Sequence, residues 1–237
     1  MNTVHTLVDT RRTPVAAQVA GEEDWAALLS SARTKSVRLA EHSVVYYEGD
    51  PADRFYEIVD GAVMLVKLLP DGRRQVVGIL GRGDIFGLPA GEDQDSTAET
   101  LVPSVLKAIE RRDVRESAAL LTHINGCLLR QLAGLREHSV LLGRKSAFER
   151  VASYLTQMVP GRALGEHCRG RPEGDRDEAV VRITMTRQEI ADYLGLTIET
   201  VSRIISDMKR KGFLVADRQD RLRITDVCAL CRKSGSR

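Results

Sequence analysis

Cysteine is scarce in this chain of 237 residues, and long apolar runs are missing. Four cysteines without the spacing of a disulfide-stapled scaffold favour a reducing cytoplasm. No apolar run approaches the length that a membrane-spanning helix needs. The first 18 residues also lack the apolar core of a secretion signal. We therefore expect a cytoplasmic protein that has no membrane partner.

Aromatic residues are also few, at 4% of the chain, and the motifs typical of enzymes are missing. The sequence contains no phosphate-cradling GxxxxGK(S/T), no HExxH and no GxSxG, so we expect no enzymatic activity. The single tryptophan, Trp25, is more simply explained as a core anchor than as a platform for a ligand. Apolar residues at 43% and charged residues at 29% are ordinary for a soluble globular protein.

Charge is distributed unevenly along the chain. The net charge is +2, but residues 180–237 contain 12 Lys or Arg against 7 Asp or Glu. The remainder of the chain is slightly acidic. A basic C-terminal part on a slightly acidic body is what a module that binds a nucleic-acid duplex would produce, although this excess alone is too small to establish it.

The N-terminal half is predicted to contain a short helix and a β domain. Residues 1–21 show no periodicity and are expected to form a loose arm, whereas residues 22–30 form a short amphipathic pattern. From residue 37 to 109, β-rich runs alternate with turn signals about every ten residues, which predicts a β-sandwich or roll. Pro70-Asp71-Gly72 predicts a hairpin turn, because proline fixes one dihedral and glycine permits a positive φ. We assign residues 22–111 to this domain.

Residues 112–143 change to a helical pattern with a coiled-coil-like seam. Positions at steps of four and three form this seam, namely Ile124, Leu128, Leu132, Leu135, Ser139 and Leu142. A small roll does not cover so long a seam, so we predict that it is the interface of a homodimer. Packing of the seam against the chain's own roll is the alternative.

Residues 184–212 are predicted to form two helices joined by a tight turn. Thr186 and Glu189 have the spacing of a capping box at the start of the first helix. Gly195 supplies the turn. Thr197 is the expected cap of the second helix, which runs to Lys211 with Gly212 as its stop. On this second helix, Val201, Ile204 or Ile205, and Met208 recur at helical steps and should point inward.

Three polar residues stand on the opposite face of the second helix, namely Glu199, Ser202 and Arg203. A recognition helix uses such positions to contact base edges in the major groove. Arginine forks onto guanine, glutamate accepts from a base amino group, and serine suits either sense. We expect DNA-backbone contacts from Thr186, Arg187, Thr197, Thr200, Lys209, Arg210 and Lys211. An ordinary helical hairpin with a solvated charged face is the alternative.

Residues 144–237 are assigned to one domain around this hairpin. Residues 145–159 read as a helix, residues 160–179 as an exposed loop rich in Gly, Pro and charge, and residues 180–185 as a strand. Residues 213–216 and 221–225 flank a turn as a wing. Its Arg218, Arg221 and Arg223 either touch the DNA backbone or minor groove, or serve as solubilising charge.

Two segments carry a resemblance to a known family. Glu199-Thr200-Val201-Ser202-Arg203 resembles the E-x-x-S-R pattern in the recognition helix of the Fnr/FixK branch of the Crp/Fnr regulators. The segment Gly83-Asp84-Ile85-Phe86-Gly87 resembles the G-(D/E)-x-x-G signature of their effector roll. The resemblance extends from about residue 44 to 224. It implies an α+β fold with an N-terminal double-stranded β-roll of cyclic-nucleotide-binding type, a long dimerisation helix and a C-terminal winged helix-turn-helix.

The resemblance also implies a function. A FixK-like regulator would bind DNA as a homodimer at a palindrome similar to TTGAT-N4-ATCAA, with RNA polymerase as its protein partner. Relatives that bind cyclic nucleotides hold the phosphate with an Arg-Ser pair, but Asp95-Ser96 stands there in this chain, and a carboxylate repels a phosphate. Fnr members hold an iron–sulfur cluster with N-terminal cysteines, which this chain lacks before Cys127. We therefore expect no cofactor and no metal.

Alternatives remain open at this point. One is a regulator of the same fold gated by a ligand or by haem, responding to redox state or nitric oxide, with His42, His123 or His138 as ligand. Another is a cyclic-nucleotide-binding enzyme subunit, which Asp95 and the missing catalytic motifs disfavour. Cys228 and Cys231 form a CxxC that could act as a redox pair, although an incidental pair is the simpler explanation. Cys127 is expected to fill apolar space.

Overall fold

The structure is a computed structural model that describes residues 22–30, 34–114, 117–159, 177–218 and 220–235. The predicted arm at residues 1–21 and most of the predicted loop, with His167 and Cys168, lie outside the described residues. The described chain divides into two compact units. The N-terminal unit ends at Arg136 and the C-terminal unit begins at Glu137. Over the described residues, no helix combines the length and the apolar character needed to span a bilayer.

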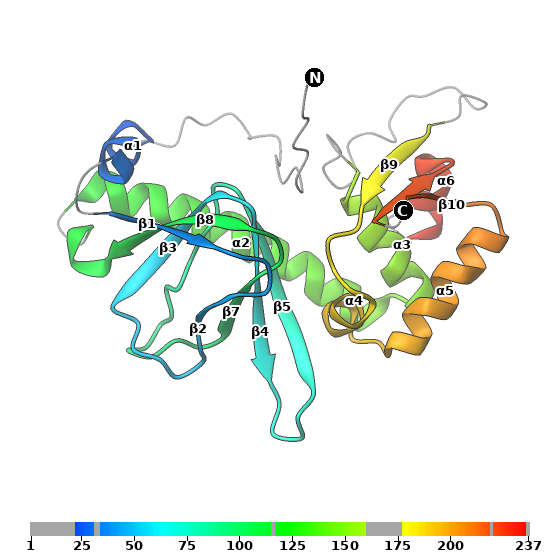
Figure 1. Ribbon diagram of the computed structural model, residues 1–237, viewed down its shortest axis with the longest axis horizontal. Helices are drawn as coiled ribbons and strands as arrows, with labels where there is room; N and C mark the ends of the chain where they lie inside the picture. The colour runs from blue at the N-terminus through cyan, green and yellow to red at the C-terminus, as the bar shows by residue number, and fades with distance from the viewer. Residues whose placement is uncertain (1–21, 31–33, 115–116, 160–176, 219, 236–237) are drawn as a thin grey trace. The chain divides into compact units, whose positions relative to one another are not determined.

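The N-terminal unit is a β-roll made of two four-stranded antiparallel sheets (Figure 1). One sheet has the order β1-β8-β3-β6, with β1 at Lys35–Leu39, β3 at Arg54–Asp60, β6 at Ile85–Phe86 and β8 at Ser104–Glu110. The other has the order β2-β7-β4-β5, with β2 at Val44–Tyr46, β4 at Ala62–Leu68, β5 at Arg74–Gly81 and β7 at Thr97–Thr100. The helix α1, Glu22–Ser30, has the predicted bounds.

Aliphatic and aromatic side chains fill the roll in two clusters. One contains Ile58, Val63 and Leu106 together with the ring of Phe86. The other joins the roll to α1 and to the start of the long helix, and Trp25 lies within it at 4% exposure. Its indole N–H donates to Glu57 Oε2 at 3.0 Å, so Trp25 is a core anchor as predicted.

The predicted hairpin turn is present between β4 and β5. The Leu69 N–H donates to Arg73 O at 2.8 Å, and Gly72 has a φ of +84°. A side chain with a Cβ would be strained at that φ, which explains the glycine.

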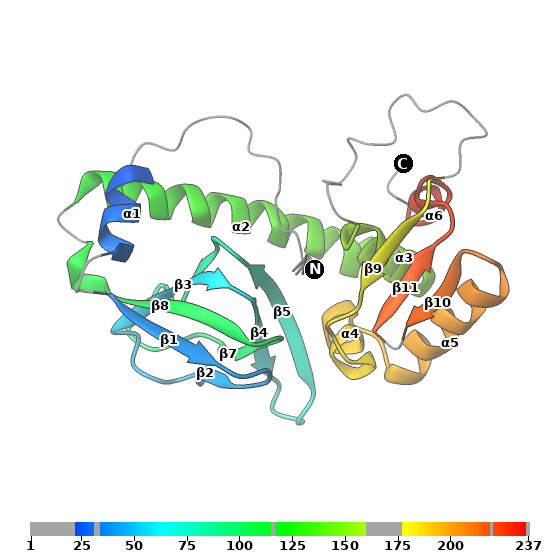
Figure 2. The same ribbon diagram turned by 45° about the horizontal axis from the view of Figure 1, so that its top comes forward.

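The long helix α2, Ala118–Arg144, follows a 3-10 turn, η1, at Arg111–Asp113 (Figure 2). It therefore begins six residues later than the predicted start of the helical segment at 112. Its last two turns, from residue 137, belong to the C-terminal unit, in which they contact the helices that follow.

The C-terminal unit is a winged helix-turn-helix. It contains α3 at Ala147–Gln157, β9 at Ala179–Arg182, α4 at Arg187–Leu194, α5 at Ile198–Arg210, β10 at Leu214–Arg218 and β11 at Arg221–Ile224. The three strands form one antiparallel sheet in the order β10-β11-β9. A final helix, α6 at Val227–Lys233, packs on α3 and was not predicted from the sequence. The fold class expected from the family resemblance is confirmed by both units.

Candidate nucleic-acid interface

Side-chain caps fix the start of both helices of the helix-turn-helix. The Thr186 hydroxyl accepts from the Glu189 N–H at 3.2 Å, and Glu189 Oε2 accepts from the Thr186 N–H at 2.7 Å. This is the predicted capping box. Thr197 caps α5 by accepting from the Thr200 N–H at 3.3 Å. Between the helices, Gly195 has a φ of +61° and ends α4 in the left-handed conformation.

The inner face of α5 anchors the helix to its unit. Val201, Ile205 and Met208 are buried, at exposures of 0 to 3%. Ile204 is only partly buried, so Ile205 fills the position that the sequence left open between the two. Because this stripe is held in the core, the opposite face of α5 is turned to solvent.

That outer face carries the three predicted base-reading residues. Glu199 and Arg203 are exposed and Ser202 is partly exposed. Ser206 lies one turn beyond Ser202 on the same face, and its hydroxyl donates to Ser202 O at 2.9 Å. The sequence analysis did not single out Ser206, although its position seven residues after Glu199 gives it the same helical face.

Local electrostatics favour the ionised form of the Glu199 carboxylate. Its own backbone N–H and the Thr197 hydroxyl hold the pKa of Glu199 below its usual range. A carboxylate in the first turn also interacts favourably with the helix dipole. Glu199 therefore stays ionised and acts only as a hydrogen-bond acceptor, which is the role that a base amino group requires.

The predicted backbone-contacting cations at the end of α5 differ in their surroundings. Asp207 binds Lys211 Nζ at 2.8 Å and also forms an ion pair with Arg210. Lys211 Nζ lies 5.9 Å from the centre of the Phe148 ring as well. Lys209 is exposed and, within the described part of the chain, forms no ion pair. Of these three cations, only Lys209 is available to a phosphate without first leaving an internal partner.

Arg187 is less accessible than a phosphate-binding arginine usually is. It lies at the first position of α4 and is half-buried beside Tyr154, and burial lowers the pKa of its guanidinium. In the wing, Arg223 pairs with Asp217 at 3.4 Å, and Arg221 is exposed. The side chain of Arg218 lies outside the described residues.

The long helix α2 exposes an apolar stripe. Leu128, Leu132 and Leu135 are 39 to 50% exposed. Ser139 is also exposed, whereas Leu142 is half-buried. Ile124 is different, because it is 7% exposed and packs in the core cluster with Trp25 and Phe55. The stripe therefore does not include Ile124 and contains the exposed Leu121 instead, which stands seven residues before Leu128.

The segments that resemble a cyclic-nucleotide site make internal contacts. Asp84 Oδ2 accepts from the Gly81 N–H at 2.9 Å, as a turn residue does. Asp95 Oδ1 accepts from the Ser96 hydroxyl at 3.1 Å, and the Asp95 carbonyl accepts from Lys67. The rings of Tyr46, Tyr56 and Phe86 pack together with centres 5.3 to 6.0 Å apart.

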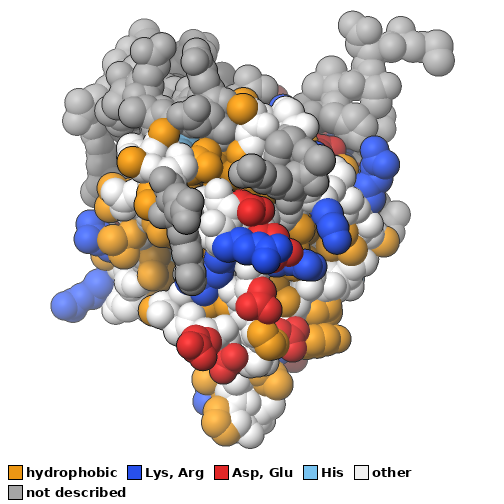
Figure 3. All heavy atoms as spheres, turned by 90° about the vertical axis from the view of Figure 1, so that its left-hand side faces the viewer, with side chains coloured by type: hydrophobic (Ala, Val, Ile, Leu, Met, Phe, Trp, Pro, Cys, Tyr) orange, Lys and Arg blue, Asp and Glu red, His pale blue; other side chains and the backbone are white. Residues whose placement is uncertain are grey.

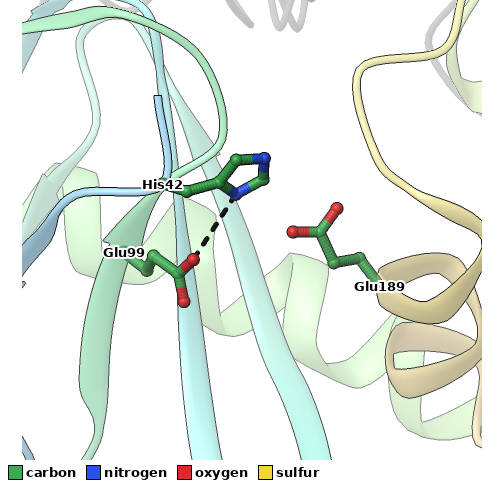
Figure 4. A group of neighbouring side chains, drawn as sticks. All are labelled: His42, Glu99 and Glu189. Atoms are coloured by element: carbon green, nitrogen blue, oxygen red, sulfur yellow. Dashed lines mark ion pairs between the residues drawn. The ribbon is translucent and has the colours of Figure 1, made fainter. Parts of the chain in front are cut away.

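The three histidines considered as haem ligands lie in different surroundings. His42 Nδ1 pairs with Glu99 Oε1 at 3.4 Å on the roll (Figure 4). The His123 ring stacks on Trp25 at 4.5 Å, and the His138 ring stacks on Tyr193 at 4.3 Å. Within the described residues of each unit, no three His, Cys, Asp or Glu ligand atoms come close enough together to hold one metal ion.

The described cysteines are free thiols. Cys127 is fully buried, burial raises the pKa of its thiol, and the sulfur accepts from Arg130 at 3.0 Å. Cys228 and Cys231 lie three residues apart on α6, and the Cys228 thiol donates to Asp177 Oδ2 at 3.5 Å. A redox role for this pair remains a prediction.

Known proteins match both units. Residues 36–119 match the cyclic nucleotide-binding domain, and residues 149–233 match the Crp-like helix-turn-helix domain. The nitrogen fixation regulation protein FixK of Rhizobium meliloti is 37% identical over 170 residues, which cover 72% of this chain and 73% of that protein. FixK of Bradyrhizobium diazoefficiens is 39% identical over 183 residues, covering 75% and 73% of the two chains.

A solved structure shows the same arrangement of elements. FixK2 from Bradyrhizobium japonicum superposes with a TM-score of 0.70 at 30% sequence identity. The match covers 84% of this chain and 96% of that one.

Proposed function

Because the chain belongs to the FixK-like branch of the Crp/Fnr family of transcription regulators, we propose that it binds a palindrome similar to TTGAT-N4-ATCAA as a homodimer and contacts RNA polymerase there. The observation that carries this proposal is the outer face of α5. It presents an exposed, ionised carboxylate, Glu199, and an exposed guanidinium, Arg203, with Ser202 between them. These groups match the donors and acceptors of a guanine and of a base amino group.

The exposed stripe on α2 supports the homodimer. Leu121, Leu128, Leu132 and Leu135 lie on one face of the helix as exposed apolar side chains that water would otherwise cover. A parallel pair of such helices buries the stripe on both copies at once, as two-fold symmetry requires. Two copies also supply the two reading helices that a palindrome needs, with half-sites about one turn of DNA apart.

The charge distribution supports a DNA contact through the C-terminal unit. Residues 180–237 carry the basic excess, with 12 Lys or Arg against 7 Asp or Glu. On the face of the roll seen in Figure 3, acidic and basic side chains lie next to one another. Such a face has no field of one sign that would attract a duplex.

The proposed regulator works without a cyclic nucleotide or an iron–sulfur cluster. Asp95 supplies a negative charge where a phosphate would need a cation, and its neighbours Ser96 and Lys67 already bond to it. The aromatic group of Tyr46, Tyr56 and Phe86 occupies roll interior, where Tyr46 and Phe86 are buried. For the cluster, four thiolates are required, and no cysteine precedes Cys127.

A haem-gated sensor of the same fold is the second candidate. The observation that favours it is His42, which is exposed on the roll with Nδ1 3.4 Å from Glu99 Oε1 and Nε2 3.7 Å from Glu41 Oε1. An absorption spectrum of the purified protein decides between the two, because a Soret band appears only when haem is bound.

Binding to labelled duplexes tests the main proposal. Wild-type protein should prefer the palindrome over a scrambled duplex, and Arg203→Ala should lose about 1–3 kcal/mol of affinity and most of its selectivity at the guanine. Lys209→Ala is the matched control, because it should weaken all sequences alike and lower the salt dependence by about one phosphate contact per protomer. Equal binding of the palindrome by wild type and Arg203→Ala would contradict the assignment.

A further inference from the structure

One guanidinium in the C-terminal unit binds carbonyl groups from three segments. Arg150, on the first turn of α3, donates through Nη2 to Leu142 O at 2.6 Å and through Nε to Lys145 O at 3.0 Å. Its Nη1 donates to Leu194 O at 2.9 Å, with Gly195 O at 3.4 Å. All three nitrogens of the side chain are used, each toward a different part of the backbone.

These carbonyl groups lie where helices end. Leu142 is in the last turn of α2, Lys145 is in the link to α3, and Leu194 is the last residue of α4. The final carbonyls of a helix have no partner within it and carry its negative dipole end. A single arginine therefore satisfies the ends of α2 and α4 together. Its rigid planar fork fixes the directions of both, which an ammonium group does not.

Two further contacts join the same segments. The His138 ring, on α2, stacks on the Tyr193 ring, on α4, with centres 4.3 Å apart and planes 20° apart. A Cβ added at Gly195 would lie 3.4 Å from both Arg150 Nη1 and Leu142 Cδ2, so the turn passes close to the end of α2. The end of the long helix is thus fastened to α4, and α4 packs directly on the reading helix α5.

We propose that Arg150 is a positioning residue that fixes the orientation of the reading helix on the end of α2 and thereby sets the half-site spacing that the dimer accepts. The inference rests on the proposed homodimer and palindrome, and assigns to Arg150 a role that involves no contact with DNA. Loss of its fork frees α4 and α5 to turn relative to α2 while the reading face itself stays intact. Each half-site is then read as before, but the two copies no longer hold one fixed separation.

Binding to a set of spaced duplexes tests this inference. The duplexes carry the two half-sites separated by three, four or five base pairs, or a single half-site in unrelated DNA. The variants are Arg150→Met, which keeps the stem and removes the fork, and Arg150→Lys, which keeps the charge. Arg144→Met is the control, because Arg144 is exposed on the last turn of α2.

Wild type and Arg144→Met should bind the four-base-pair spacing on the order of 10² more tightly than the other spacings, as rigidly linked binding sites do. Arg150→Met should keep its half-site affinity within about threefold and lose at least about tenfold of the spacing preference. Arg150→Lys should lose part of it. Half-site binding and circular dichroism establish that each variant is folded, and Arg150→Lys decides the question if Arg150→Met does not fold.

Each contrary outcome has a distinct pattern. An unchanged spacing preference in both Arg150 variants would overturn the positioning role while leaving the proposed function intact. An equal loss on the half-site and on every palindrome would also overturn it, because that pattern reports only a structural defect. A wild type without any spacing preference would defeat the homodimer on a palindrome, and with it the inference.

Discussion

Asp207 restrains two of the cations predicted to contact phosphates, and its removal should change how DNA affinity depends on salt. The carboxylate binds Lys211, four residues further along the chain, at 2.8 Å, and it forms an ion pair with Arg210, three residues further along. Hydrogen bonds from Lys211 and Arg210 hold the pKa of Asp207 below its usual range, so it is ionised whenever DNA would compete for these cations. An acid near the C-terminal end of a helix is unfavourable toward the helix dipole. The two ion pairs therefore offset an otherwise poor placement.

The size of the effect follows from the number of cations released. Asp207→Asn frees two per protomer, and thus up to four in a dimer. Each additional phosphate contact steepens the slope of log affinity against log salt by about 0.9. If between two and four cations reach phosphates, the slope steepens by about 1.8 to 3.6. Across a rise from 50 to 200 mM salt, the variant should lose roughly 12- to 150-fold more affinity than wild type.

Fluorescence anisotropy with a duplex that lacks the palindrome measures this slope directly. The matched control is Asp192→Asn, which removes the same charge from α4, where Asp192 accepts a hydrogen bond from Gln188 at 2.7 Å and, among the described residues, from no cation. Asp207→Asn should bind the unrelated duplex more tightly at 50 mM salt, and the ratio of palindrome to unrelated affinity should fall. Equal slopes for Asp207→Asn, Asp192→Asn and wild type would refute the reasoning, since they would place Arg210 and Lys211 away from DNA.

Two further predictions concern the dimer and the joint at the end of α2. Leu132→Glu should weaken dimerisation at least about 100-fold, because it buries an unpaired charge in the interface. The control Ala133→Glu, which is exposed about 100° away on the same helix, should not weaken it. Sedimentation velocity distinguishes the two variants, and a dimeric Leu132→Glu would show that the stripe is not in the interface. His138 is buried beside the positive Arg150, and both effects lower its pKa below the ordinary 6.5. The unfolded chain then binds the proton at His138 more readily than the folded chain does. The contribution of His138 to the free energy of unfolding should therefore be fully present above pH 6.5 and should fall by up to about 1.4 kcal/mol per pH unit below it. His138→Phe keeps the ring stack but cannot bind the proton. Urea unfolding at pH 7.5 and 5.5 should therefore show a smaller loss of free energy of unfolding in His138→Phe than in wild type. An identical pH dependence in both proteins would refute the role of His138.

Local chemistry made the reading head predictable from sequence. The Thr186–Glu189 capping box, the glycine turn at Gly195 and the Thr197 cap each involve residues within four positions of one another. Such short-range signals do not depend on the rest of the fold. The same reason explains why α1 was predicted with its observed bounds and why the β4–β5 turn was recognised.

Contacts between distant residues were not predictable in this way. The strands β6 and β7 are two and four residues long, too short for a pattern, and they exist because longer strands pair with them. Ile124 fits the heptad spacing of the seam, yet the roll and α1 cover it. Periodicity states that a face is apolar but does not state which neighbour covers it.

The sequence by itself determined that this protein has a β-rich unit, a long amphipathic helix and a capped helix-turn-helix with a Glu-Ser-Arg face, because each follows from periodicity and capping over a few residues. Only the tertiary structure decided which charges that face can use. It half-buries Arg187 beside Tyr154 and gathers the ends of α2 and α4 on Arg150. Those contacts depend on how separate helices come together in space, since an arginine binds whichever carbonyl the packed chain brings within reach.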